Sequence, residues 1–131
     1  MVKKIKQQRS ASAIEKPQPI NAVFGFSQLQ PISYTEAEND SHFFLGFLDR
    51  LRKLSSLDWN TIWTTHRHSF GTEMIPSSRL KKAASNSMPL DLEKLIVLRA
   101  TGDNHAFLGY REGNVFQILF IEYRFGDIYQ H

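Results

Sequence analysis

The sequence predicts one α+β domain: an N-terminal strand, two consecutive helices and an antiparallel C-terminal meander of three to four strands, with the helices on one face. Three observations support this fold class. Apolar residues recur every three or four positions over 44–54, as in an amphipathic helix. Short Gly, Asn and Asp turns separate β-branched and aromatic runs over 95–122, as in hairpins. The 131 residues, 41% of them hydrophobic, suffice for one compact core.

The domain is expected to span residues 20–131, behind a flexible basic tail at 1–19. The tail is rich in Lys, Gln, Ser and Pro and has no apolar periodicity, so it buries too little surface to order itself. Five basic residues and one acidic residue give it a charge of +4, which leaves 3 − 4 = −1 for residues 20–131. The basic isoelectric point therefore belongs to the tail rather than to the domain.

The first strand is expected within 21–29, where Phe24, Phe26 and Gln28 share one face. The first helix begins after Asp40 or Ser41, either of which can cap it. The apolar face of this helix is formed by Phe44, Phe47, Leu48, Leu51 and Leu54.

The second helix is expected to begin after Asp58 as its cap and to end before Gly71, with Trp59, Ile62 and Trp63 as its apolar residues. Residues 76–90 mix Pro, Ser, Lys and Asn, which indicates a loop with at most one short helical turn near Leu80.

Three strands are expected at 95–101, 105–111 and 115–122. The last is apolar on both faces. Alternation places Phe116, Ile118 and Phe120 on one face of the strand. It places Val115, Leu119 and Ile121 on the other face. One face is expected to pack on the helices. The other needs a cover from the lead-in to the first strand, the tail or a partner chain, since large exposed apolar patches are rare.

The sequence argues against a cofactor, a bound metal ion and a membrane-spanning segment. The chain has no Cys, no phosphate-binding glycine loop and no other standard cofactor motif, so no cofactor is expected. His66 and His68 would point some 200° apart on a helix, so a shared metal ion is not expected. No apolar run approaches the roughly 18 residues of a membrane helix, and no export signal follows Met1, which predicts a cytoplasmic protein without a membrane partner.

Charge is unevenly distributed along the domain. Residues 50–99 hold nine basic and four acidic residues, a balance of +5. A basic surface would form if these side chains converged, and a merely solvated face is the alternative. The side chains concerned are Arg50, Arg52, Lys53, Arg67, Arg79, Lys81, Lys82 and Arg99.

The C-terminal third resembles a known family in order and residue character. The segments 98–102, 107–111 and 115–121, followed by Arg124 and Tyr129, are similar to the end of RelE-type toxins of the RelE/ParE superfamily. The resemblance is strongest over residues 96–129. It implies a toxin–antitoxin protein that cleaves mRNA without a metal, in contact with RNA or the ribosome, and an antitoxin partner that covers the apolar sheet.

The resemblance also implies a site. Its catalytic residues would be His66, His68, Arg124 and Tyr129, and its RNA phosphate contacts would come from Arg67, Arg99, His105 and Arg111. The base could equally be His131. RNA cleavage needs a base for the 2′-hydroxyl, cations for the transition state and an acid for the leaving oxygen, which these residue types supply. The family's paired strand lysines are missing, and Val97 and Arg99 stand in that stretch.

Two alternatives stay open. One is a non-catalytic binding module, such as an accessory protein of a phage or mobile element, which keeps the toxin-like fold without its active residues. The absent lysines and the domain charge of −1 favour it. The other is a relative directed at DNA gyrase within the same superfamily, which needs no nuclease residues.

Overall fold

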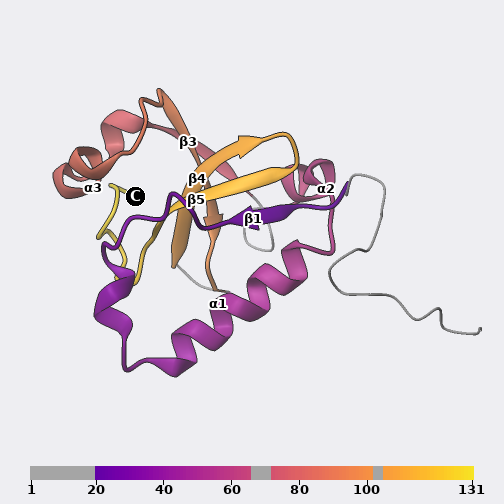
Figure 1. The fold of residues 1–131 in the computed structure, drawn as a ribbon, viewed down its shortest axis with the longest axis horizontal. Helices are drawn as coiled ribbons and strands as arrows, with labels where there is room; N and C mark the ends of the chain where they lie inside the picture. Colours follow the sequence, from indigo (N-terminus) through magenta and orange to yellow (C-terminus); the bar gives the residue numbers. More distant parts are fainter. Residues whose placement is uncertain (1–19, 66–71, 102–104) are drawn as a thin grey trace, which may run out of the picture.

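A single sheet organises the chain. The computed structural model describes residues 20–65, 72–101 and 105–131. Five strands lie in the order β1-β5-β4-β3-β2, with β1 parallel to β5 and every other pair antiparallel (Figure 1). Their bounds are Val23–Gly25 for β1, Glu73–Pro76 for β2, Lys94–Arg99 for β3, Ala106–Glu112 for β4 and Val115–Ile121 for β5. The predicted α+β class is confirmed.

Two helices precede the meander, as predicted. They are α1 (Ser41–Leu54) and α2 (Trp59–Thr64). Asp40 caps α1 by accepting the Phe43 N–H at 3.0 Å, and Asp58 caps α2 by accepting the Thr61 N–H at 2.8 Å. These aspartates satisfy donors that the first helical turn leaves unpaired. The rest of the helical structure is a third short helix, α3 (Lys82–Ser87), and two 3₁₀ turns, η1 (Tyr34–Ala37) and η2 (Ser77–Arg79).

The first face of the sheet is covered by α1 and α2. Four α1 side chains are buried there at helical spacing, which is why α1 lies flat along the sheet. They are Phe43, Phe47, Leu51 and Leu54. They pack with Leu98 of β3, Phe107 of β4 and Phe116 of β5. The predicted apolar face was wrong at Leu48, which is 63% exposed, and it missed Phe43. Trp59 anchors α2 to the same core and donates its indole N–H to the Asn114 carbonyl at 2.9 Å.

The second face is covered by the chain itself, so the expectation of a lead-in, tail or partner cover was wrong. Leu80 and α3 lie over this face, and the last residues of the chain return to it with Ile128 and Tyr129 fully buried (Figure 1). Leu80 and Tyr129 form an antiparallel bridge, and the Lys81 N–H donates to the Ile128 carbonyl at 2.7 Å. The predicted loop over 76–90 is therefore a structured layer.

A bulge in β5 changes the predicted alternation. Leu108 of β4 pairs with Phe120, but the next residue, Gly109, pairs with Ile118, so Leu119 is an extra residue in β5. Leu119 and Phe120 both contribute to the second core, whereas Ile118 and Ile121 contribute to the first. Placing Phe120 beside Ile118 was therefore wrong, because regular alternation does not survive a bulge.

One strand is shorter than predicted, and one strand was not predicted. The first strand is limited to Val23–Gly25, and the Phe26 side chain after it is half exposed. The strand β2 was not predicted, because only Ile75 among its residues is buried. The second helix ends at Thr64, before Gly71 as predicted, because Thr65 already has extended backbone. Within the described ranges, no helix is long and apolar enough to cross a membrane.

The bulge yields a first prediction. A Cβ added at Gly109 would lie 1.9 Å from the Gln117 carbonyl oxygen of β5, so Gly109→Ala forces the two strands apart. We expect a loss of about 3 kcal/mol in unfolding free energy, measured by urea denaturation. Gly46→Ala in α1 is the matched control: its nearest contact is 3.5 Å, and it should be neutral or stabilising by up to about 1 kcal/mol. Equal midpoints for the two variants would contradict the close approach at the bulge.

Candidate functional site

Of the described site residues implied by the toxin resemblance, Arg99, Tyr129 and the candidate base His131 lie close together, whereas His105, Arg111 and Arg124 lie elsewhere. His66, Arg67 and His68 fall outside the described residues. Arg111 lies at the β4–β5 turn, where its guanidinium donates twice to the Gly113 carbonyl, at 2.8 and 3.0 Å. The same guanidinium lies 4.9 Å from the centre of the Trp59 ring. The arrangement fastens the hairpin to α2.

Arg124 lies on another part of the molecule. Its guanidinium pairs with the Glu36 carboxylate of η1 and lies 5.6 Å from the centre of the Tyr123 ring. The pairing with Glu36 raises the pKa of Arg124. Both charged side chains are more than half exposed, so the ion pair contributes little to stability.

Tyr129 is a core residue. It is fully buried in the second core. Burial raises the pKa of its hydroxyl to about 12, and the positive charge of Arg99 partly offsets this rise. Arg99 lies on the same face and is 4.0 Å from the Glu73 carboxylate. The Tyr129 ring therefore packs within the protein and is not exposed at the surface.

His131 is part of the same C-terminal layer. Its Nε2 lies 2.7 Å from the fully buried carboxylate of Glu122, and its ring stacks 3.9 Å from both Phe125 and Tyr129. Glu122 also accepts the Ile128 N–H at 3.0 Å. These contacts hold the end of the chain against the sheet, which assigns His131 a structural role.

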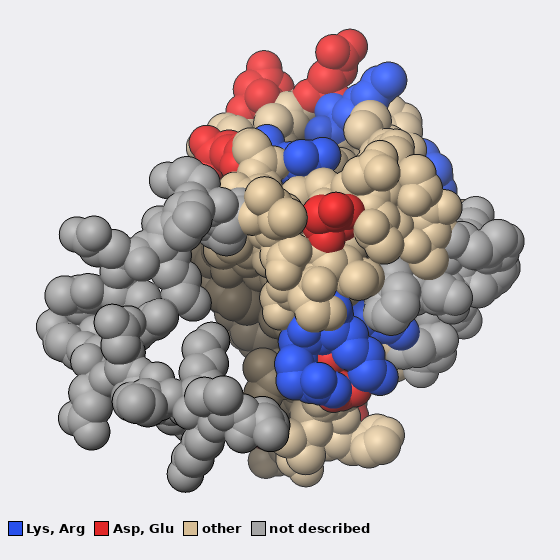
Figure 2. Space-filling model, turned by 90° about the vertical axis from the view of Figure 1, so that its right-hand side faces the viewer, with Lys and Arg blue, Asp and Glu red and all other residues tan. Residues whose placement is uncertain are grey.

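The described basic residues of 50–99, which exclude Arg67, do not form one surface. Figure 2 shows Lys and Arg side chains in separate groups on one side of the molecule, with acidic side chains beside them. Arg79 lies at the second core, where it donates to the Gln130 carbonyl at 3.0 Å and lies 5.7 Å from the centre of the Tyr129 ring. Arg50 and Lys53 lie on α1, at the first face. The sheet separates these groups.

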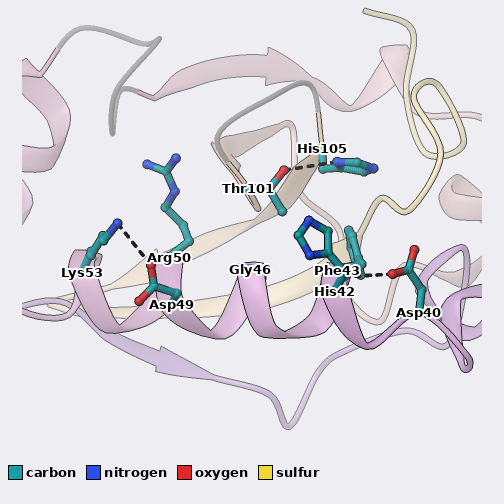
Figure 3. A pocket seen from close by; sticks show the side chains of 9 residues that line it. All are labelled: Asp40, His42, Phe43, Gly46, Asp49, Arg50, Lys53, Thr101 and His105. Atoms are coloured by element: carbon teal, nitrogen blue, oxygen red, sulfur yellow. Dashed lines mark hydrogen bonds and ion pairs between the residues drawn. The ribbon is translucent and has the colours of Figure 1, made fainter.

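A pocket of about 470 Å³ is the strongest candidate site in the described part of the chain. It lies between one flank of α1 and the adjoining ends of β3 and β4 (Figure 3). Its α1 residues recur at helical spacing along one flank, and two residues face them from the sheet. The lining residues are Asp40, His42, Phe43, Gly46, Asp49, Arg50, Lys53, Thr101 and His105.

His105 is fixed in the pocket wall. Its Nδ1 lies 3.1 Å from the Thr101 hydroxyl. Its ring meets Phe43 edge-on at 5.1 Å and stacks over Tyr123 at 6.3 Å. A polar contact on one nitrogen and rings on two sides determine how the imidazole is oriented. Among the described residues implied by the toxin resemblance, His105 is the one that reaches the pocket.

The two pocket carboxylates are held by internal donors. Asp40 accepts the Tyr123 hydroxyl at 2.7 Å and the Phe43 N–H, and these bonds lower the pKa of its carboxyl. Asp49 accepts from Arg52 and lies 3.1 Å from the Lys53 ammonium, which lowers the pKa of Asp49. Both groups are therefore ionised at neutral pH and partly balanced within the protein.

Arg50 supplies a cation to the pocket. Its side chain rises from α1 on the same side as His42 and the Thr101–His105 pair (Figure 3). Burial lowers the pKa of Arg50 and the neighbouring Asp49 partly offsets this, yet a guanidinium keeps its proton at any physiological pH. Gly46 leaves room beneath these groups, because it has no side chain to fill the pocket floor.

The donor set suits an anion better than a metal. Within the described ranges, no group of three or more His, Cys, Asp or Glu side chains is arranged to hold a metal ion. Comparison with protein-family models, with curated proteins and with solved structures found no match. The pocket therefore has to be interpreted from its own residues.

Arg50 and Lys53 were predicted from the sequence as members of a possible basic surface, whereas His42 and Asp40 were not predicted as site residues. A signal was present: His42, Gly46, Asp49 and Lys53 recur every three or four residues beside the apolar face of α1. The partner wall formed by Thr101 and His105 lies some 55 residues further along the chain, and only the fold brings it to α1.

The Asp40–Tyr123 contact yields a second prediction. Tyr123→Phe removes the hydroxyl donor, so the pKa of Asp40 should rise towards its ordinary value, measured by NMR titration of the carboxyl carbon. A carboxyl with a depressed native pKa stabilises the fold above its unfolded pKa and loses that contribution as it protonates. The variant should therefore be less stable than the wild type at pH 7, with the difference shrinking between about pH 5 and pH 2. A difference independent of pH would contradict this role of the contact.

Proposed function

We propose that the chain binds RNA through the α1 pocket, with a backbone phosphate held between Arg50, Lys53 and the two imidazoles. One observation carries the proposal: Arg50, Lys53 and two histidines line one pocket, and its carboxylates accept hydrogen bonds from Tyr123 and Arg52, with Lys53 shared between Asp49 and the pocket. A guanidinium and an ammonium together suit a phosphodiester, because both donate charge-assisted hydrogen bonds to its oxygens.

Cleavage of the bound RNA is the stronger form of this proposal and keeps the expected class, a metal-free endoribonuclease toxin acting on mRNA in the cytoplasm. Imidazoles titrate near neutral pH, so one can take the 2′-hydroxyl proton while the other protonates the leaving 5′-oxygen. Here His42 and His105 fill these roles, with His105 positioned by Thr101. This form of the proposal includes an antitoxin partner. That partner would have to bind elsewhere than the second face of the sheet, which the chain itself covers.

A non-catalytic RNA-binding module is the second candidate. The separation of Arg111, Arg124 and Tyr129 favours it, because the cations and phenol of a toxin-like site are used in structural contacts instead. This candidate shares the pocket and the phosphate contact with the first. The two differ only in whether the imidazoles transfer protons.

Binding gives a third prediction. Arg50→Ala should weaken binding of a single-stranded RNA by about tenfold and reduce the slope of log K against log salt by about 0.7, the value for one phosphate contact on a single strand. The measurement is fluorescence anisotropy with a labelled oligonucleotide at several salt concentrations. Arg111→Ala removes the same charge far from the pocket and should leave both quantities nearly unchanged. A larger effect for Arg111→Ala would move the binding site to the hairpin.

Catalysis gives a fourth prediction. If the imidazoles transfer protons, His42→Ala and His105→Ala should each reduce cleavage of RNA by about a hundredfold or more. Loss of an imidazole contact to phosphate should weaken binding of a 2′-deoxy analogue, which cannot be cleaved by this route, by no more than about tenfold. The readout is gel analysis of labelled RNA with chelator present. Wild-type protein that binds but never cleaves supports the binding module instead.

A further inference from the structure

The outward face of α1 carries apolar side chains that the domain does not bury. Leu45 and Leu48 are 66% and 63% exposed, and Phe44 beside them is half-buried. Residues three and four apart on a helix are neighbours, so these three form one apolar stripe. The buried face of α1 points the opposite way, towards Leu98 and Phe107. Single exposed leucines are ordinary, but a contiguous stripe on a docked helix indicates a contact surface.

The ends of this stripe carry opposite charges. Glu38 and Asp40 lie just before α1, and Arg52 and Lys53 lie in its last turn, where both pair with Asp49 and leave a net positive charge. The Glu38 side chain is exposed, and the Arg52 side chain is 71% exposed. The surface thus runs from acidic through apolar to basic along the helix axis.

Such a surface is complementary to a second copy of itself that runs in the opposite direction. The point midway between Leu45 and Leu48 is the same number of residues from Asp40 as from Lys53, about 10 Å at the rise of an α-helix. We propose that a second copy of this chain packs its α1 antiparallel on this stripe, forming a two-fold dimer. Leu45 of each copy then meets Leu48 of the other, and each acidic end lies beside a basic end.

A parallel arrangement is disfavoured by the same charges, because it sets acidic ends against each other and basic ends against each other. The apolar area is small, so the dimer forms at high protein concentration and is weakened by salt. A two-fold axis perpendicular to both helices leaves the pocket flanks of the two copies on the same side, so association does not require the pocket to close.

Sedimentation of the full chain up to about 1 mM tests this arrangement. The wild type should show a concentration-dependent dimer, and Leu48→Glu should raise the dimer dissociation constant by at least about tenfold. The matched control is Met74→Glu, an equally apolar exposed side chain on β2, which should leave the constant unchanged. Circular dichroism checks that each variant is folded. A wild type that stays monomeric at every concentration, or a dimer dissociated by Met74→Glu and not by Leu48→Glu, overturns the proposal.

Charge reversal tests the direction of packing. Arg52→Glu and Glu38→Lys should each weaken the dimer, and the double variant should restore it, because each interface then regains opposite charges in exchanged positions. Single reversals without effect, or a double variant no better than the worse single one, would overturn the antiparallel arrangement even if Leu48→Glu dissociates the dimer.

Discussion

Burial of the sheet on both faces is the constraint on which the rest of this structure depends. The three central strands β3, β4 and β5 carry apolar side chains above and below, so each face needs its own covering layer. The helices α1 and α2 cover one face. The segment from Leu80 through α3 and the C-terminal residues cover the other, where the buried Glu122 carboxylate holds the Ile128 N–H and His131.

This constraint determines which residues are available for chemistry. Tyr129 packs inside the second layer, and the guanidinium of Arg99 in β3 lies beside the Glu73 carboxylate, so both groups serve contacts within the fold. The first layer has the opposite effect. Because Phe43 docks α1 beside the β3–β4 ends, the helix flank that carries His42 and Arg50 faces His105 across a pocket. The site is thus a consequence of how the first layer is attached.

Local features of the fold could be predicted from the sequence. The aspartate caps at Asp40 and Asp58 and the hairpin turn at 113–114 follow from residue type and spacing, because they depend on neighbours within a few positions. The extra residue at Leu119 could not be predicted in this way, since a bulge depends on how β4 and β5 are paired. The same holds for the burial of Tyr129, which depends on a return of the chain to Leu80. The residues of the candidate site were the hardest to predict from the sequence, because the pocket joins residues that are distant in sequence.

The central claim is that the pocket on α1, rather than the C-terminal arginines and tyrosine, receives RNA. NMR of the imidazole and guanidinium resonances during titration with a 2′-deoxy-substituted RNA analogue tests it most directly. If RNA binds in the pocket, the resonances of His42, His105 and Arg50 shift with one common affinity while those of Arg124 stay in place. Shifts centred on Arg124 or Arg111, with the pocket imidazoles unchanged, would contradict it.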